Sequence, residues 1–599
     1  MAVITTSKAQ TEYDVIIVGS GAGGGQTAYT LTLAGLKCVM LEAGRAYDPA
    51  TQTAMFHRPD QAPLLNTPTP DKQMGFTDAT VDGGWNIPAE PYTQASDKPE
   101  EQFQWWRPRM LGGRTNHWGR MSLRNGPYDF KPRSRDGLGF DWPIAYDDIE
   151  PYYTRVEMLI GVFGTNEGRE NTPNSPPGVL LPPPKARAAE LYLQKHVKTL
   201  GIPVIPIHRA VLTRPLDAET IPAKLHPGNA WAQRIVADSM RVRGACFWAT
   251  DCHRGCSLRA NYQSTTVHLP PALATGNLDI IPNAHAREVT LGQDGKANGV
   301  LYIDKSTGQE ARVRAKAVVL AASSGETVRL LLNSKSAAFP QGLGNGHGLV
   351  GKYIMDSVGG SVGGQIPALE NLPPHNEDGA GGPHLYIPWW LYQEQLAGKL
   401  DFPRGYHIEF SSSRSMPGGR SPLGDDLARG AYGTKFKEEA RRHYGSQVGY
   451  TVRGEMIANE NSFAELDPAV KDKWGIPVLR WHWRWSDHEL NMVAHGIKTF
   501  TAMIEAMGGK AHVRAGSTAK NIIEPGGKVI HEVGGALMGS DPAKSVCNEW
   551  NQLWDVKNIF LCDGSPFPSN ADKNPTLTIM ALAWRAADKI VEQARKGNL

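Results

Sequence analysis

The sequence predicts an α/β fold, and three observations near the N-terminus support this. The first is a short apolar run rich in β-branched residues, 13–18, which is typical of a buried parallel strand. The second is the pattern G-x-G-x-x-G that follows at residues 19–24. The third is a helical segment from Gln26 to about Gly35, followed by a second strand over residues 37–41. Strand, glycine turn, helix and strand in this order form the first unit of a nucleotide-binding fold.

Each glycine of this turn has a separate expected task. Gly19 permits a tight turn, Gly21 lets the backbone approach a pyrophosphate, and Gly24 allows close packing of helix on strand. The helix N-terminus would offer free N–H groups to the phosphates. Glu42 would accept hydrogen bonds from a ribose diol. A purely structural glycine loop is the alternative, and the flanking strand, helix and acid disfavour it. The motif alone fits FAD or NAD, but the run E-A-G at 42–44 is more usual in FAD proteins.

Composition narrows the classes of function. The chain has 599 residues, enough for a large core and for several domains, and a net charge of +3 with 21% charged residues. This balance gives no support for nucleic-acid binding. No apolar run approaches the ~20 residues of a membrane-spanning helix, and the first residues lack a signal-peptide pattern. Taken by itself, the chain is expected to be cytoplasmic.

Several motifs further along resemble those of the glucose–methanol–choline oxidoreductase family over nearly the full length. They are the runs at 109–119, 317–327, 348–356, 531–539, 558–565 and 574–583. The last three form the most specific block. Within the family, the closest resemblance is to large subunits of bacterial sugar dehydrogenases, such as gluconate 2-dehydrogenase and glucoside 3-dehydrogenase. One departure is Leu537, which stands where relatives often have an arginine.

The resemblance implies two domains, each assembled from separated segments. One is an FAD-binding domain of the Rossmann, glutathione-reductase-like type, and the other is a substrate domain built on an antiparallel sheet with helices. The expected FAD-binding segments are residues 12–131, 243–358 and 520–599. The expected substrate segments are residues 132–242 and 359–519.

The resemblance also implies which residues contact the cofactor. Besides the N-terminal glycines and Glu42, these are Gly112, Gly113, Asn116, His117, Val289, Asp563, Gly564 and Thr576. His117 lies where some relatives attach the flavin covalently through a histidine. Its alternative role is packing beside the isoalloxazine ring.

Oxidation of an alcohol removes a proton from O–H and a hydride from C–H, and flavin N5 accepts the hydride. Histidine is the best general base near neutral pH. By resemblance the base is His531, and Asn574 would donate a hydrogen bond to the same substrate oxygen. The alternatives are a structural histidine and, because Pro575 follows Asn574, a plain turn residue.

Three of the six cysteines, Cys246, Cys252 and Cys256, fall within eleven residues. Thiolates this close can converge on a metal centre. Zinc with His253 is one option, although adjacent Cys252 and His253 suit a tetrahedron poorly. Buried thiols or a Cys252–Cys256 disulfide are the structural alternatives. Some sugar dehydrogenase large subunits carry an iron–sulfur cluster in this region, which implies a three-iron (3Fe-4S) cluster here, although Phe247 stands where the related motif often has a second cysteine.

The combined prediction is an FAD-dependent dehydrogenase that oxidises a secondary hydroxyl of a sugar or glycoside, first C3 of a glucoside. Electrons would pass through the cluster to a cytochrome c-type acceptor. A small signal-bearing partner subunit would carry the folded chain to the periplasm, with a cytoplasmic life as the alternative. Rival functions are a pyranose-like sugar oxidase using dioxygen, a choline or aliphatic alcohol dehydrogenase, and a catalytically silent FAD-binding subunit. Tryptophans at 389–390 and 481–485 would suit stacking on sugar faces, with core packing as the plainer role.

Overall fold

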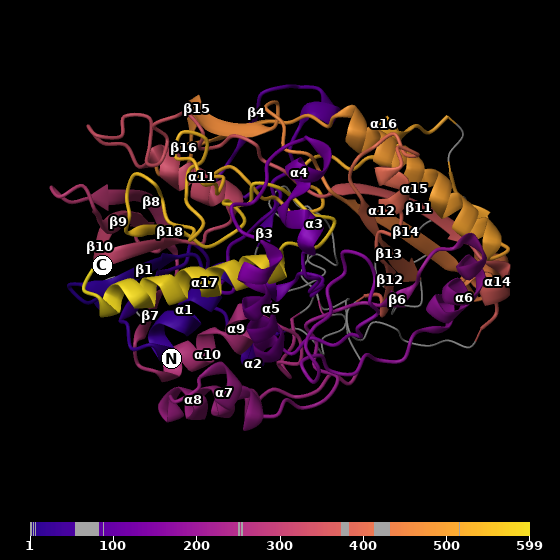
Figure 1. Ribbon diagram of the computed structural model, residues 1–599, viewed down its shortest axis with the longest axis horizontal. Helices are drawn as coiled ribbons and strands as arrows, with labels where there is room; N and C mark the ends of the chain where they lie inside the picture. Colours follow the sequence, from indigo (N-terminus) through magenta and orange to yellow (C-terminus); the bar gives the residue numbers. More distant parts are fainter. Residues whose placement is uncertain are drawn as a thin grey trace.

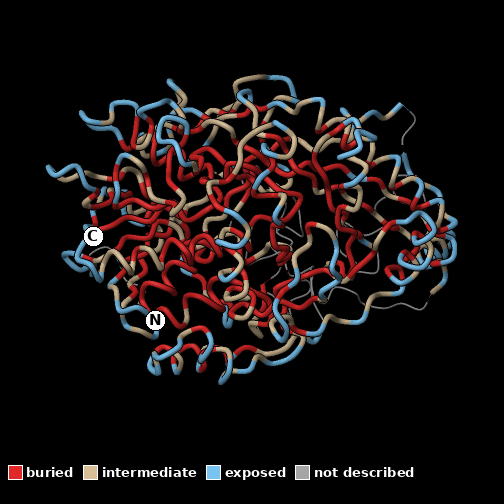
Figure 2. Tube along the Cα trace, viewed as in Figure 1, coloured by how far each residue is buried: buried red, intermediate tan, exposed pale blue. Residues whose placement is uncertain are grey.

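A computed structural model describes residues 8–53, 83–87, 89–248, 255–372, 382–412, 432–513 and 516–599, together with residues 3, 5 and 252. Figure 1 shows two main regions side by side, one around β1, β9 and β10 and the other around β11–β14. Both chain termini lie in the first region. Buried chain runs through both regions and between them, and exposed chain is confined to the periphery (Figure 2). The predicted α/β class is confirmed.

The first sheet has seven strands in the order β7-β2-β1-β10-β9-β8, with β18 also paired to β10. Its parallel part consists of β1 (Tyr13–Val18), β2 (Cys38–Leu41), β7 (Leu278–Ile281), β18 (Ile559–Leu561) and the second half of β10 (Gln309–Leu320). The antiparallel part adds β8 (Ala284–Leu291) and β9 (Ala297–Asp304). The apolar run that predicts the first strand is buried on both faces, as expected for a parallel strand covered by helices.

Two helices cover the parallel strands. Helix α1 (Ala22–Leu33) starts directly after the glycine turn and packs against α17 (Thr576–Arg595), the last helix of the chain. Helix α17 in turn packs on α5 (Tyr146–Ile160), where the hydroxyls of Tyr153 and Thr578 lie 2.8 Å apart. Helices α1 and α17, from the two ends of the chain, are therefore neighbours.

The second sheet is antiparallel and has six strands in the order β17-β11-β14-β13-β12-β6. They are β6 (Ile205–Pro206), β11 (Val358–Gln365), β12 (Leu385–Ile387), β13 (Tyr406–Ser412), β14 (Gln447–Gly454) and β17 (Lys510–Ala511). Helix α15 (Asp487–Ala506) packs on β11 and β14. Its start is set by a capping box between Ser486 and Glu489.

A three-stranded sheet joins β15 (Phe463–Lys471), β16 (Pro477–His482) and β4 (Thr93–Gln94), and a two-stranded one joins β3 (Gly83–Gly84) and β5 (Arg107–Pro108). The remaining α-helices are α2 (Pro49–Gln52), α3 (Pro127–Phe130), α4 (Pro132–Asp136), α6 (Ala188–Val197), α7 (Thr220–Leu225), α8 (Ala230–Arg241), α9 (Ser264–Val267), α10 (Leu269–Ala274), α11 (Ser324–Asn333), α12 (Tyr392–Leu396), α14 (Gly433–His443) and α16 (Ala519–Ile522). The short 3-10 helices are η4 (Pro99–Glu101), η5 (Gly113–Asn116), η6 (Lys198–Leu200) and η8 (Pro367–Leu369). Among the described residues, no helix has both the length and the apolar character needed to cross a bilayer.

The tryptophan-rich run at 480–485 belongs largely to the core. Strand β16 ends at His482, because the chain then leaves the sheet to start α15. Trp481 is fully buried and stacks on Phe103 with ring centroids 4.2 Å apart, and Trp483 is also buried. Trp389 is buried as well. These three rings therefore pack the interior, which is the plainer of the two roles expected of them.

Candidate active site

A cavity lies at the carboxyl ends of β1, β2 and β10 and is lined by segments that are far apart in the sequence. Its walls come from residues 18–23, 41–43, 107–109, 114–115, 118, 284–286, 321–324, 326, 329–330, 530–532, 563–564, 575–576 and 579. Ligands of open α/β sheets bind at this edge, outside the carboxyl ends of the strands. The glycine turn and the predicted base His531 thus line the same cavity.

The three glycines of the turn have different surroundings. Gly19 has φ +98°, and a Cβ there would lie 2.4 Å from the carbonyl oxygen of Ala321. A Cβ on Gly24 would lie 1.9 Å from the carbonyl oxygen of Gly19. Around Gly21, by contrast, no atom lies within 4 Å of such a Cβ. The backbone is therefore closed at Gly19 and Gly24 and open toward the cavity at Gly21, where a phosphate group would need access.

Helix α1 begins at this opening, and Gly21, its N-cap residue, supplies no side-chain cap. Its first N–H groups and the positive end of its dipole are therefore available to an anion. Glu42 follows β2 and accepts hydrogen bonds from the backbone N–H of Ser20 (3.2 Å) and of Gly44 (2.7 Å), and a short one from the Ser20 hydroxyl. Burial raises the pKa of Glu42, and these hydrogen bonds oppose the rise.

The segment at 112–117 lies over the glycine turn. The Gly112 N–H donates to Ser20 Oγ at 2.8 Å, and a Cβ on Gly113 would lie 3.6 Å from Gly21 Cα. Asn116 donates to the Leu111 carbonyl at 2.9 Å, and the His117 ring packs on Trp106 at 4.2 Å. These four residues are not among those that line the cavity, which instead meets their neighbours Arg114, Thr115 and Trp118.

The C-terminal segments close the opposite wall. Asp563 accepts hydrogen bonds from the N–H groups of Ser323 (3.1 Å) and Ser565 (2.9 Å) and from the Thr327 hydroxyl (2.6 Å). Gly564 and Thr576 also line the cavity, and helix α17 starts at Thr576 without a side-chain cap. A second free helix N-terminus therefore meets the cavity.

Val289 and Gly24 lie outside the cavity lining. Val289 is buried on β8, and its N–H donates to Ser334 Oγ at 2.9 Å. The cavity meets β8 at residues 284–286 instead.

Within the cavity, Nη1 of Arg329 is buried and has no hydrogen-bond partner among the described residues. An unpartnered guanidinium N–H in this wall suits an anionic or carbonyl-bearing cofactor.

The structure brings the two predicted catalytic residues together. Nδ2 of Asn574 lies 3.3 Å from Nε2 of His531, and Ser357 Oγ lies 3.0 Å from its Nδ1. The backbone N–H of His531 donates to Asp356 at 2.9 Å. With the Asn574 amide donating, Nε2 accepts and the ring proton sits on Nδ1, where Ser357 Oγ accepts it. This tautomer leaves Nε2 unprotonated, as a base requires.

The surroundings of His531 keep its ring neutral. Its pKa falls from 6.5 to about 3, mainly through burial and then through the charge of Arg453, while Glu409 opposes the fall. Arg453 on β14 pairs with Glu409 on β13 at 3.3 Å, and Glu409 lies 3.4 Å from Nε2 of His407. These polar groups belong to the second sheet.

Sequence reasoning passed over several residues of this site. Ser357 directly follows the family-like motif at 348–356, so the sequence could have indicated that it lies near the site. Its contact with His531 could not be read from the sequence. Arg109 opens another recognised run and bridges Glu90 and Glu326, at 2.5 and 2.6 Å. Arg114 forms a short ion pair with Glu532, the residue after the base. Only the folded chain shows these partners, because they come from distant segments.

In the part of the chain that the structure describes, the three clustered cysteines form no disulfide; Cys252 and Cys256 are buried and Cys246 is half-buried. The disulfide alternative is therefore not formed. Among the described residues, these sulfur atoms do not all lie within 4.8 Å of one another, so they do not hold one metal ion as placed. His253 lies outside the described residues. Cys252 interacts electrostatically with Arg209, and Cys256 with Arg243, two buried cations.

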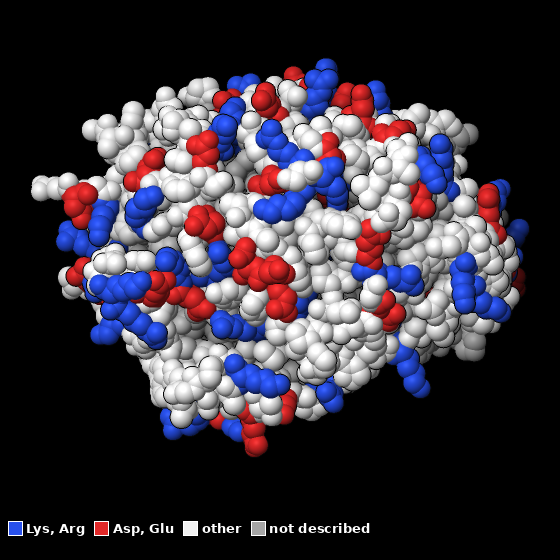
Figure 3. Space-filling view, in the orientation of Figure 1, with Lys and Arg blue, Asp and Glu red and all other residues white. Residues whose placement is uncertain are grey.

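The face shown in Figure 3 carries basic and acidic side chains interspersed, without a large patch of one sign. This distribution agrees with the modest net charge of +3. On this face, nothing suggests binding of a polyanion such as nucleic acid.

Comparison with known proteins gives consistent matches. Two family models, both described as GMC oxidoreductase, match residues 227–356 and 459–583. The chain is 29% identical to 2-methyl-1,2-propanediol dehydrogenase of Mycolicibacterium austroafricanum, over 98% of its own length and 96% of that protein. It is 26% identical to the fructose dehydrogenase large subunit of Gluconobacter japonicus, over 98% of each chain. Formate oxidase of Aspergillus oryzae RIB40 has a similar fold, with a TM-score of 0.61, 14% identity and coverage of 99% and 100% of the two chains.

Proposed function

The chain belongs to the GMC oxidoreductase family of FAD-dependent enzymes that act on CH–OH groups, and from that premise we propose that it is a dehydrogenase of a secondary hydroxyl in a sugar or glycoside. One observation carries the proposal. One cavity is lined both by the glycine turn, which suits a dinucleotide, and by the neutral His531. Asn574, which pairs with His531, adjoins the same cavity. The first position we propose for oxidation is C3 of a glucoside.

The cavity fits FAD in its donor groups. The open backbone at Gly21 and the uncapped start of α1 would receive the pyrophosphate, and Glu42 would hold the ribose. The N-terminus of α17 would face the flavin end, on the side of His531. Bound there, FAD supplies a hydride acceptor.

The protein's own part in the reaction is proton transfer and orientation. Nε2 of His531 takes the proton of the substrate hydroxyl, and its neutral state makes it ready to do so. The Asn574 amide, which lies 3.3 Å from Nε2 of His531, would donate to the same substrate oxygen and so fix the C–H direction. Ser357 holds Nδ1 and keeps the ring in the required tautomer. His407, Glu409 and Arg453 offer donors and acceptors that suit a substrate with several hydroxyl groups.

The clustered thiols support a proposed iron–sulfur cluster that relays electrons to a cytochrome-type acceptor. Buried Arg209 and Arg243 would balance the negative charge of thiolates at Cys252 and Cys256. A cluster spaces its thiolates more widely than a single zinc ion does. Iron and acid-labile sulfide in the purified protein, lost in Cys252→Ser, would support this part. Their absence, with rapid reduction of dioxygen, would favour an oxidase.

The relative described as a large subunit supports a multi-subunit assembly for this chain. We propose a small signal-bearing partner subunit that exports the complex to the periplasm. Co-purification of such a subunit from the periplasmic fraction would test this, and recovery of the active chain alone from the cytoplasm would contradict it.

A second candidate is oxidation of a short aliphatic diol. It is favoured by the 29% identity to a 2-methyl-1,2-propanediol dehydrogenase, the highest among the full-length relatives compared above. The charged groups around His531 favour a sugar over such a small substrate, because a diol has too few hydroxyls to engage them.

The test is anaerobic loss of oxidised-flavin absorbance with methyl glucoside, fructose, gluconate, choline and 2-methyl-1,2-propanediol. We expect methyl glucoside to bleach the flavin, and His531→Ala to slow bleaching by ~10²–10⁴-fold. His482→Ala is the matched control, because His482 lies on β16 and bonds Glu465 at 2.9 Å. Bleaching by the diol alone would replace the sugar with an aliphatic substrate. Unchanged bleaching in His531→Ala would remove His531 from the base role.

A further inference from the structure

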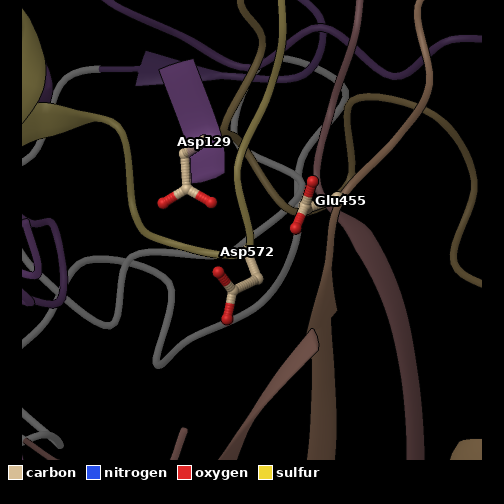
Figure 4. Close-up of side chains that lie close together, drawn as sticks. All are labelled: Asp129, Glu455 and Asp572. Carbon is tan, nitrogen blue, oxygen red and sulfur yellow. The ribbon is translucent and has the colours of Figure 1, made fainter. Parts of the chain in front are cut away.

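Three buried carboxylates meet beside the proposed active site. Asp129 belongs to α3, Glu455 follows β14, and Asp572 lies in the loop before α17, yet one oxygen of each lies within 4.8 Å of the others. Figure 4 shows the three side chains close together, although they come from separate segments. All three are buried. Such a concentration of negative charge in the interior requires cations nearby.

Lys573 supplies the central cation. Its Nζ lies 3.1 Å from Asp129 Oδ2 and 2.5 Å from Asp572 Oδ1, and the lysine itself is buried. Asp129 also accepts hydrogen bonds from Asn171 Nδ2 at 2.9 Å and from the Gly126 N–H at 2.7 Å. An ammonium group therefore already stands among the carboxylates, so the cluster is an ion-pair anchor and not a place for a metal ion.

This anchor holds the loop that carries Asn574. Lys573 is the residue directly before Asn574, and the Asp572 carbonyl accepts a short hydrogen bond from Nδ1 of His407 on β13. Earlier in the loop, the Ser569 hydroxyl donates to the Asp129 carbonyl at 3.3 Å. The loop is thus bonded to α3 on one side and to β13 of the antiparallel sheet on the other. Asn574 comes directly after the bonded residues in the chain.

We propose that Lys573 is a positioning residue, whose ammonium group between Asp129 and Asp572 fixes the loop and so sets the contact between Asn574 and His531. The inference rests on the proposed function, because it assigns Lys573 a task in the reaction of that pair. Lys573 is not among the residues that line the cavity, and its ammonium group pairs with Asp129 and Asp572. Its effect on the reaction passes entirely through Asn574.

Glu455 offers a matched control within the same cluster. Neither of its carboxylate oxygens has a hydrogen-bond donor among the described residues, and its nearest cation is Arg404 at 3.7 Å. Burial raises its pKa, with Arg135 and Arg404 opposing and Asp129 and Asp572 adding to the rise. Glu455 is not bonded to Lys573 in this arrangement. Glu455→Gln keeps the size of the side chain and removes no tie to the loop.

The test is a double-mutant cycle on the full-length, FAD-loaded enzyme with Lys573→Met, Asn574→Ala and the double variant. The rate of anaerobic flavin reduction by saturating methyl glucoside, or by whichever probe above bleaches the flavin, is measured together with KM, FAD content and thermal midpoint. We expect Lys573→Met to slow flavin reduction ~10–100-fold with FAD retained. In the Asn574→Ala background, the same substitution should change the rate by less than about twofold. Lys573→Arg should recover most of the rate, and Glu455→Gln should keep it.

The outcomes separate this inference from the proposed function. If Asn574→Ala does not slow flavin reduction, the proposed role of Asn574 fails first. If Asn574→Ala slows the reaction but the two effects multiply in the double variant, Lys573 acts through stability and not through Asn574, and the inference is overturned. Should Lys573→Met fail to fold, Asp129→Asn removes one tie and keeps the Lys573–Asp572 pair. We expect it to show a smaller fall that likewise vanishes in the Asn574→Ala background, and multiplying effects would again overturn the inference.

Discussion

The ring of His531 is held neutral by its position, and two charges on neighbouring strands act on it in opposite directions. Its pKa is lowered from 6.5 to about 3, so the basic form persists as the pH falls well below neutral. We therefore expect the rate of flavin reduction to show no acid limb near pH 6.5. Arg453→Met should raise the pKa of His531 and move the limb upward, because a repelling cation is lost. Glu409→Gln should move it downward, because an attracting anion is lost.

The measurement is the anaerobic rate of flavin reduction between about pH 2 and pH 9 in the wild type and both variants, a range that includes the pKa of about 3. Arg314→Met is the control, since Arg314 is exposed on β10 in the other sheet. Shifts of the limb in the same direction for Arg453→Met and Glu409→Gln would contradict the electrostatic account.

For single residues, the sequence predicts site membership where a short motif carries the signal. His531, Asn574, Glu42 and Gly21 were predicted from motifs, and the structure places each of them in or beside the cavity. Their roles stay predictions. Ser357 and Lys573 were not predicted, because their significance depends on contacts with residues far away in the chain.

Among the structural elements, the turn between β1 and α1 permits a prediction that separates cofactor contact from packing. A Cβ on Gly21 meets no atom within 4 Å, whereas on Gly24 it would lie 1.9 Å from the Gly19 carbonyl oxygen. Gly21→Ala should change the free energy of unfolding of the apoprotein by less than ~1 kcal/mol, because the poorer N-cap and the lower entropy of the unfolded chain oppose each other. It should weaken FAD binding about tenfold, roughly 1.4 kcal/mol. Gly24→Ala should destabilise the apoprotein by ~1–3 kcal/mol.

Denaturant unfolding of the two apoproteins and FAD titration followed by fluorescence would check both expectations. Equal destabilisation of the two apoproteins would show that Gly21 also has a packing role. Unchanged FAD affinity in Gly21→Ala would place the pyrophosphate elsewhere.

The elements also show where prediction from sequence stops. The first strand and helix were predicted within a few residues, because hydrophobic pattern and glycine spacing are local signals. The antiparallel sheet was expected only through resemblance. Its strand β11 pairs with β14 and β17, and the short strands β6 and β12 carry almost no pattern of their own. The tryptophans at 481 and 483 left two roles open, since a large ring suits a core as well as a sugar face, and their burial fits the core-packing role.

For the whole molecule, the main consequence of the fold is that the cofactor cavity joins the start, the middle and the end of the chain. Its lining includes residues 18–23, 321–324, 563–564 and 575–576, all around one sheet edge. FAD binding should therefore stabilise the chain as a unit, by RT ln(1 + [FAD]/Kd), or about 2.7 kcal/mol at 100 times Kd. FMN should stabilise it far less, because FMN lacks the adenylate half that the glycine turn and Glu42 would hold.

The check is the thermal unfolding midpoint of apoprotein, followed by far-ultraviolet circular dichroism, at increasing FAD or FMN. The midpoint should rise steadily with FAD in the wild type and in His531→Ala, since His531 would face only the flavin end. Gly21→Ala should need a higher FAD concentration for the same rise. Equal shifts with FMN and FAD would mean that the N-terminal turn contributes nothing to binding. In that case the resemblance of residues 19–24 to a dinucleotide loop would be one of shape alone, and the cavity would owe its affinity to the C-terminal wall around Asp563 and Thr576.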